Sequence, residues 1–144
     1  MKVKVINLNP NNFLPKYETP DSSGIDLKAS IYAEMTVDPG ERILVPTGLK
    51  MAIPSGYECQ IRPRSGLALK KGITVLNTPG TIDASFRGEI GVIIINHSND
   101  TFTINPGDRI AQAVFSKVEH VELEEVNELD ETERGEGGFG HTGI

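Results

Sequence analysis

Short turn signals built on proline, glycine, asparagine and aspartate interrupt this chain at close intervals, and this spacing limits what the chain can fold into. Proline fixes φ and glycine allows positive φ, so such clusters end a helix or a strand. The runs between them are short and rich in β-branched residues, which favours strands. We therefore predict an all-β fold. The turn signals lie at 20–24, 38–40, 54–56, 98–100 and 106–108.

The predicted strands are numerous and evenly spaced, which is typical of a distorted jelly roll or β-barrel. One segment, 65–71 (SGLALKK), is composed mainly of good helix formers, and Ser65 is its candidate N-cap. We expect one short helix there. The strands are predicted at 3–7, 25–29, 35–37, 42–45, 49–53, 58–61, 73–76, 89–96, 101–104 and 110–117.

The composition fits a single domain, because 144 residues with 38% hydrophobic content can bury one core. The N-terminus lacks the apolar stretch of a signal peptide, and no later run approaches the length of a membrane span. We expect a cytoplasmic protein with no membrane partner. The single cysteine, Cys59, excludes an intramolecular disulfide and is best interpreted as a small core residue on a strand.

The formal net charge of −6 is unevenly distributed. Segment 119–136 holds nine acids and one base, whereas the residues before it are slightly positive. Such an acidic run is typical of a solvated linker. An acidic protein binds duplex DNA poorly, because that affinity depends on clustered Lys and Arg, so we expect no stable nucleic-acid binding. Binding of a small anion, in contrast, requires only a few cationic side chains close together.

Segment 76–96 (LNTPGTIDASFRGEIGVIIIN) is predicted to form a β-hairpin with polar chemistry at its bend. Its far arm, 89–95, is almost continuous in β-branched residues and predicts a buried strand. The near arm is 72–77. Between them, Pro79 and Gly80 bend the backbone and leave main-chain N–H and C=O groups without ladder partners. Such groups can recognise the edge of a planar ligand.

An aliphatic side chain, a carboxylate and an aromatic ring follow this bend, at Ile82, Asp83 and Phe86. Nucleotide hydrolysis needs a base for water, a wall for the sugar or base, and hydrogen bonds for identity. The alternative is an ordinary loop with a solvated Asp83, since short motifs produce many false positives.

A second polar cluster, 62–66 (RPRSG), lies where a strand is expected to end and the helix to begin. Helix N-termini offer free N–H groups, and the Arg64 guanidinium fits phosphate oxygens, so this segment is a candidate phosphate cradle. An arginine on a sheet rim, with Ser65 as a cap, is the alternative. Asp26 could hold a metal's water or be a turn acid, and Gln112 either points at a ligand or closes a structural network.

The C-terminal segment 134–143 (RGEGGFGHTG) carries five glycines around one phenylalanine. Glycine loses much backbone freedom on folding, so this arm needs something else to order it. Glycine-rich backbone can approach phosphates closely, Arg134 and Thr142 can donate to them, and Phe139 can stack on a base. A disordered tail is the alternative interpretation.

Taken together, these segments resemble the trimeric dUTPase family, the deoxyuridine triphosphate nucleotidohydrolases, over essentially the whole chain. The family has five ordered motifs, and five similar segments occur here in the same order. A single motif is weak evidence, whereas five at suitable spacing are specific. They are SSGIDLKA at 22–29, RPRSGLALK at 62–70, NTPGTIDASFRGE at 77–89, GDRIAQAVF at 107–115 and RGEGGFGHTG at 134–143.

The resemblance implies hydrolysis of dUTP to dUMP and pyrophosphate, which keeps uracil out of DNA and supplies dUMP for thymidylate synthesis. Asp83 matches the water-activating carboxylate, with attack on the α-phosphorus. Asp26 matches an acid that holds Mg²⁺ through water. Phe86 stands where the family usually has tyrosine, so the ring against deoxyribose remains and a phenol is lost. The implied substrate-binding residues are Arg64, Ser65, Gly66, Asn77, Gly80, Thr81, Ile82, Asp83, Phe86, Gln112, Arg134, Phe139, Gly140, Thr142 and Gly143.

The resemblance also implies a homotrimer whose sites are shared between subunits. Residues 1–118 would form the β-barrel domain, and residues 119–144 an acidic linker and arm that closes a neighbouring subunit's site. Two departures affect local contacts only: His141 replaces a common serine, and Gly91 lacks a longer side chain.

Two other functions share this scaffold. In dCTP deaminases, which resemble the same family, a catalytic glutamate lies on the strand after the hairpin, whereas here segment 92–95 is wholly aliphatic. A nonenzymatic nucleotide sensor or protein-binding module would show a damaged motif. Within the five motifs, only the changes at Phe86 and His141 depart from the pattern.

Overall fold

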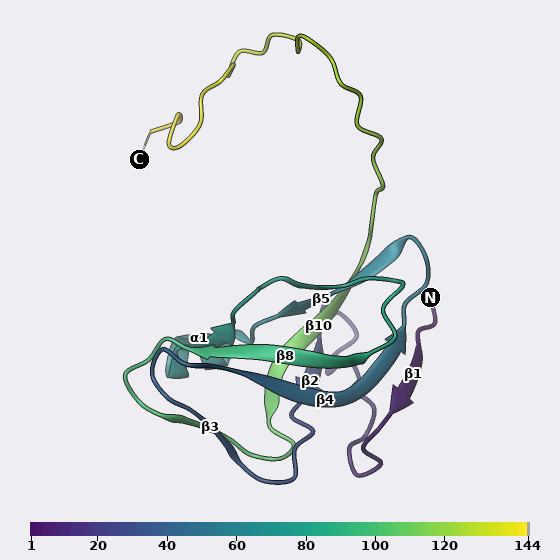
Figure 1. Ribbon diagram of the computed structural model, residues 1–144, viewed down its shortest axis with the longest axis vertical. Helices are drawn as coiled ribbons and strands as arrows, with labels where there is room; N and C mark the ends of the chain where they lie inside the picture. The colour runs from purple at the N-terminus through teal and green to yellow at the C-terminus, as the bar shows by residue number, and fades with distance from the viewer. Residues whose placement is uncertain (144) are drawn as a thin grey trace.

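The computed structural model describes residues 1–143 and folds them into β-sheets with one short helix (Figure 1). A long C-terminal segment leaves the sheets after the last strand and runs through open space. The elements are β1 (Lys4–Asn7), β2 (Ile25–Lys28), β3 (Met35–Val37), β4 (Arg42–Ala52), β5 (Tyr57–Arg62), α1 (Ser65–Lys71), β6 (Ile73–Val75), β7 (Gly80–Ile82), β8 (Glu89–Asn96), β9 (Phe102–Ile104) and β10 (Arg109–Lys117).

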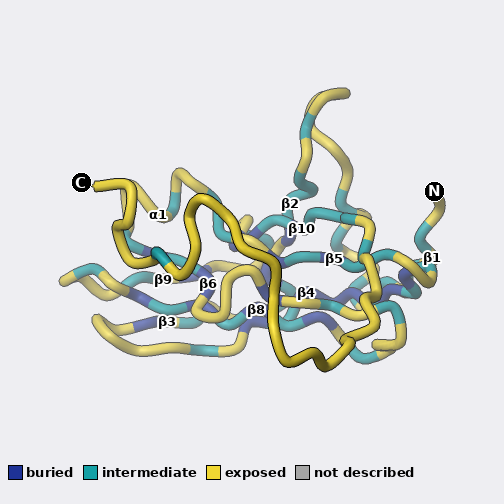
Figure 2. The backbone as a smooth tube through the Cα atoms, turned by 90° about the horizontal axis from the view of Figure 1, so that it is seen from above, coloured by how far each residue is buried: buried dark blue, intermediate teal, exposed yellow. Residues whose placement is uncertain are grey.

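Two four-stranded sheets, in the orders β1-β4-β8-β6 and β2-β10-β5-β7, enclose the core, and β3-β9 forms a small third sheet. Burial alternates along β8, so Ile90, Val92 and Ile94 point inward as the period of a half-buried strand requires. Leu27 and Ile61 contribute from the other sheet. Figure 2 shows the buried stretches within the strands and the exposed C-terminal segment. The predicted all-β jelly roll is confirmed, with open sheets and no closed barrel.

The predicted hairpin arms are correct, since β6 pairs antiparallel with β8 and Ile73 faces Asn96. Two predictions of strand limits were wrong. Segments 42–45 and 49–53 belong to one strand, β4, whose register with β8 shifts between Pro46 and Lys50. The three-residue β7 was missed, because Gly80 and Thr81 next to Pro79 gave a turn signal.

Helix α1 begins and ends where the sequence predicted, but its cap differs. The N-cap is Arg64, in extended conformation, and no side chain makes a capping hydrogen bond, so the prediction that Ser65 caps the helix was wrong. Ser65 is the first helical residue. The helix ends at Gly72, whose φ of 64° places it in the left-handed region that favours glycine.

Cys59 lies on β5 with no exposed surface, as predicted for a core residue. Burial, together with the charge of nearby Glu58, raises the pKa of this thiol to about 12. Within residues 1–143, no helix is long and apolar enough to cross a membrane.

Candidate functional site

One row of side chains crosses the sheet β2-β10-β5 near the start of helix α1. Gln112 on β10 is the direct register partner of Asp26 on β2 and of Arg62 on β5. Its Nε2 donates to the carbonyl of Pro63 at 2.9 Å, and its amide fills the space beside Gly24. Of the two predicted roles for Gln112, the structure shows the network one, and this network ties three segments together.

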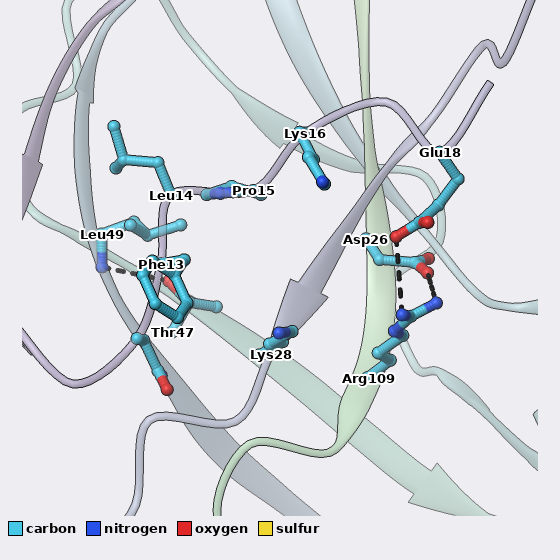
Figure 3. Close-up of a pocket in the computed structure, with 11 residues that line it drawn as sticks. Phe13, Leu14, Pro15, Lys16, Glu18, Asp26, Lys28, Thr47, Leu49 and Arg109 are labelled. Atoms are coloured by element: carbon cyan, nitrogen blue, oxygen red, sulfur yellow. Dashed lines mark hydrogen bonds and ion pairs between the residues drawn. The ribbon is translucent and has the colours of Figure 1, made fainter.

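Asp26 lies between two arginines. Its Oδ1 accepts from Nε of Arg64 at 3.1 Å, and its Oδ2 accepts from Nη1 of Arg109 at 3.2 Å. Arg109 also forms an ion pair with Glu18, with 3.5 Å between Nη2 and Oε1, as Figure 3 shows. Arg109 was not among the predicted site residues. Its position directly after Asp108 and shortly before Gln112 was the available signal.

The helix start presents the predicted phosphate-binding segment to the surface. Arg64 donates from Nη1 to the carbonyl of Arg109 at 3.3 Å, which holds its side chain beside Asp26. Ser65 and Gly66 are exposed, and a β-carbon on Gly66 would meet nothing within 4 Å. The first turn of α1 leaves N–H groups without partners inside the helix, and Arg64 stands at its N-cap. This arrangement can bind an anion.

The hairpin bend is partly paired, which corrects the prediction that its backbone is free. Gly80, Thr81 and Ile82 form β7 and pair with Ile61, Gln60 and Cys59 of β5. Because β7 is the last strand of its sheet, its other edge keeps unpaired backbone groups within the described part of the chain.

Asn77 and Phe86 flank this edge. The Asn77 Nδ2 would lie 3.3 Å from a β-carbon on Gly80, so the amide covers that glycine. The Phe86 ring lies over Gly88, where a β-carbon would come within 2.6 Å of Cζ, and the ring is 40% exposed. Arg87 holds the loop by donating to the carbonyl of Ala84 and, at 2.8 Å, to that of Phe86. An amide therefore lies against the first residue of β7, and a partly exposed aromatic ring follows that strand in the chain.

Asp83 is exposed and borders a hollow of about 460 Å³ together with Thr81, Glu58 and His120. Its backbone carbonyl accepts from the N–H of Phe86 at 3.1 Å, and this bond turns the loop. No hydrogen bond or ion pair between described residues joins the Asp83 side chain to Asp26 or Arg64. Asp83 follows Ile82, which pairs with Cys59 near the start of β5, whereas Arg64 lies beyond the end of that strand. One chain therefore carries two separate groups of predicted site residues.

Residues 134–143 of the C-terminal arm form no hydrogen bond or ion pair with either group. Arg134 donates from Nε to the carbonyl of Gly137 at 2.8 Å, and the His141 ring packs against Gly137. Phe139 has φ of 47° and is fully exposed. Gly140, Thr142 and Gly143 are exposed as well, whereas Ile144 lies outside the described residues. The arm is a series of local turns with its ring free to contact a partner.

Metal-binding side chains are sparse. Among residues 1–143, no group of three or more His, Cys, Asp or Glu side chains gathers closely enough to hold a metal ion. Both oxygens of Asp26 already accept from arginines. Mg²⁺ often keeps several waters and binds through one or two carboxylates plus substrate phosphates. The single carboxylate of Asp26 therefore fits a metal ion that is held mainly by phosphate oxygens and water.

The open jelly roll and its surface groups define a class of protein. A nucleotide hydrolase needs groups that bind phosphate and a carboxylate near the nucleoside. This surface offers two arginines, an acid and an amide near the helix start, and a separate carboxylate close in sequence to an aromatic ring. The chain belongs to the dUTPase family, whose model matches residues 11–143.

Curated relatives agree with this assignment. The deoxyuridine 5′-triphosphate nucleotidohydrolase of Fusobacterium nucleatum is 62% identical over 90% of this chain and 89% of its own. That of Syntrophotalea carbinolica is 57% identical over 99% of this chain and 97% of its own.

Solved structures show the same fold. The dUTPase of Staphylococcus bacteriophage 80alpha, as its G164S mutant with dUpNHpp, superposes with a TM-score of 0.89 at 26% identity, covering 99% of both chains. A second structure of the bacteriophage 80alpha dUTPase with dUpNHpp gives a TM-score of 0.88 at 26% identity, covering 99% of both chains.

Proposed function

We propose that this protein hydrolyses dUTP to dUMP and pyrophosphate, by attack of water on the α-phosphorus. Membership in the dUTPase family and the names of its curated relatives support the substrate. In the cell, the reaction would keep uracil out of DNA and supply dUMP for thymidylate synthesis. A cytoplasmic location belongs to the same proposal.

Asp83 is the proposed general base. A carboxylate that accepts a proton from water can contribute on the order of 10²- to 10⁴-fold to the rate, provided that it lies within hydrogen-bond reach of that water. Exposure of Asp83 next to the Phe86 loop leaves room for water and substrate. The chain needs no covalent nucleophile, since transfer of a phosphoryl-type group mainly requires alignment and charge stabilisation.

The proposed phosphate site is built from Arg64, Ser65, Gly66 and Gln112. The guanidinium of Arg64 is already oriented by Asp26, so less conformational freedom is lost when phosphate binds. The Ser65 hydroxyl is not used as a helix cap and can donate to a phosphate oxygen. Gln112 would contribute by holding the carbonyl of Pro63 and thereby the turn into α1.

The nucleoside would bind along the free edge of β7. Asn77 and the backbone of Gly80, Thr81 and Ile82 offer donors and acceptors in the plane of a pyrimidine. The Phe86 ring would pack against deoxyribose, and a 2′-hydroxyl would meet an apolar face that cannot hydrogen-bond to it. Discrimination against UTP therefore relies on the ring itself.

Mg²⁺ is the proposed cofactor, with Asp26 contacting it through water. When bound, the ion would neutralise charge on the phosphate oxygens. Asp26 would accept from the metal's water while it keeps Arg64 and Arg109 in position. The arginines themselves stabilise negative charge on the phosphates.

The separation of Asp83 from Arg64 within one chain is the observation on which the proposed assembly rests. We assign the complete site to a homotrimer in which the hairpin of one subunit faces the phosphate site of its neighbour. An apolar outer surface on β4 and β8 supports subunit contact, since Leu44 is 63% exposed and lies against Gly91.

Residues 1–118 would form the folded body and residues 119–144 the linker and arm. The linker 119–133 can span up to about 50 Å when extended, which is enough to reach another subunit. Arg134, Phe139, Gly140, Thr142 and Gly143 would close over the substrate, with the Phe139 ring on uracil. Binding energy from those contacts would order the arm.

Release of pyrophosphate from dUTP, measured beside UTP, dTTP and dCTP, tests the proposed function. We expect pyrophosphate release from dUTP and no comparable release from UTP, dTTP or dCTP. Release of ammonia from dCTP would indicate the deaminase activity instead, and binding without turnover of any of the four nucleotides would indicate a sensor.

A further inference from the structure

A second hollow, of about 480 Å³, is lined by Asp26 and by three basic side chains. Figure 3 shows Lys16, Lys28 and Arg109 around it, with Phe13 on its other side. This volume is within the range of small-molecule sites, about 300 to 1,000 Å³.

The placement of the charges is unusual for a sheet surface. Lys28 on β2 is the direct register partner of Arg109 on β10, and like charges directly opposite each other destabilise a pair of strands. Asp26 lies two residues from Lys28, on the same face of β2, but it already pairs with Arg64 and Arg109.

The remaining acid of the hollow is also engaged. Glu18 pairs with Arg109, with 3.5 Å between Oε1 and Nη2. No ion pair between described residues involves Lys16 or Lys28. Two ammonium groups therefore face the hollow with their charge uncompensated, which is the condition under which an anion gains affinity.

The opposite wall is apolar. Phe13 is 89% exposed, and Leu14 and Leu49 line the hollow beside it. An exposed aromatic ring next to unpaired cations suits a ligand with one planar and one anionic part, since stacking on such a ring is worth about 1–3 kcal/mol for a nucleobase.

We propose that this hollow is a second nucleotide site, which binds a nucleoside monophosphate with its phosphate between Lys16 and Lys28 and its base on Phe13. The hollow shares Asp26 and Arg109 with the candidate phosphate site, whereas Lys16, Lys28 and Phe13 belong neither to that site nor to the Asp83 hairpin. The existence of this second site does not depend on the activity proposed above.

Titration of AMP into the full-length protein by calorimetry, with and without a nonhydrolysable dUTP analogue, tests the proposal. We expect saturable binding in both conditions. Lys28→Ala and Lys16→Ala should each weaken binding about tenfold, the effect of losing one charge-assisted contact. Phe13→Ala should weaken AMP binding and leave the weaker binding of inorganic phosphate unchanged.

Lys117→Ala is the matched control, because Lys117 is an exposed lysine at the opposite end of β10 from Arg109. It should bind AMP as the unaltered chain does, and all variants should hydrolyse dUTP at a similar rate. The proposal is overturned if AMP does not bind, if the dUTP analogue displaces it, or if the lysine substitutions at 16 and 28 leave its affinity unchanged.

Discussion

The side-chain amide of Gln112 lies over Gly24, in the space that a β-carbon at residue 24 would occupy. From there its Nε2 reaches the carbonyl of Pro63 at 2.9 Å. Gly24 precedes the strand that carries Asp26, and Pro63 precedes the N-cap residue Arg64. One contact between a glycine and an amide thus fixes the spacing between the acid and the arginine of the proposed phosphate site.

Gly24→Ala should displace the Gln112 amide and break its bond to Pro63. We expect the free energy of unfolding to fall by about 1 kcal/mol, the typical net value of one hydrogen bond. The kcat/KM for dUTP should fall about tenfold, since the turn before Arg64 loses its support. Urea unfolding and steady-state kinetics measure the two effects.

The double variant Gly24→Ala/Gln112→Ala is the control for this steric route. If the alanine acts only by displacing the amide, the double variant should resemble Gln112→Ala alone, because neighbouring sites are not additive. Additive losses of stability in the two single variants would contradict the explanation.

Asp26→Asn should change the metal requirement more than the stability. Its arginine partners keep 33% and 44% of their side-chain surface exposed, and ion pairs of this kind are worth less than about 1 kcal/mol. We expect the Mg²⁺ concentration for half-maximal activity to rise about tenfold, because outer contacts to a metal commonly matter by that factor. Activity measured against Mg²⁺ concentration tests this.

Glu18→Gln is the matched control for Asp26→Asn. It removes a second partner of Arg109, with the pair at 3.5 Å, and leaves Asp26 intact. The Mg²⁺ dependence of this variant should match that of the unaltered chain. An unchanged dependence in Asp26→Asn itself would remove Asp26 from the metal's surroundings.

Mixing two inactive variants tests whether the site is shared between subunits. Asp83→Asn lacks the proposed base, and Arg64→Ala lacks the proposed phosphate-binding arginine, so each variant alone should be inactive. After unfolding and refolding of an equal mixture, about one site in four should combine an intact hairpin with an intact neighbouring Arg64. Pyrophosphate release should therefore recover to about a quarter of normal.

The refolded single variants, each alone, are the controls for this mixing. If hairpin and phosphate site of the same chain formed the site, no mixed assembly would contain an intact one. The mixture would then stay as inactive as its components, and the shared site would be excluded.

The sequence predicted the framework of this fold well because its signals are local. Segment 89–95 is an almost continuous run of β-branched residues, and the limits of β8 followed from that composition. β7 was missed because its pairing with β5 depends on residues about twenty positions away, which no local signal reports. The cap of α1 was misassigned because serine is a common N-cap residue, whereas here Arg64 is the N-cap and Ser65 is already helical.

The candidate site was predicted by residue type and only partly by position. Asp26, Arg64 and Gln112 do lie together, since their strands pair in register. The role of Arg109 depends on a strand pairing between residues far apart in the chain, and the sequence pattern alone did not reveal it. The distance between Asp83 and this group likewise follows from tertiary structure.

Truncation after Glu133 should separate folding from turnover. The hydrogen bonds of residues 134–143 are all local, so the shortened chain should keep its thermal midpoint and its proposed trimeric state. Turnover of dUTP should fall at least a hundredfold, as expected when a closing segment is lost. Calorimetry, sedimentation and kinetics check the three outcomes, and full activity would exclude a catalytic role for the arm.

Cys59 should make the protein less stable as the pH rises above about 9. Burial raises the pKa of its thiol from 9.0 to about 12, so between these values the unfolded chain loses a proton that the folded chain keeps. The folded state therefore loses up to about 1.4 kcal/mol of stability per pH unit in this window from this group. Below pH 9 the thiol is protonated in both states and contributes no slope.

Cys59→Ala isolates this effect from the lysines and tyrosines that titrate in the same range. Urea unfolding at intervals from pH 8 to pH 11 should give a shallower decline for the variant than for the unaltered chain, because the variant has no thiol to ionise on unfolding. Parallel declines for the two proteins would mean that the buried thiol ionises as readily in the folded state as in the unfolded one.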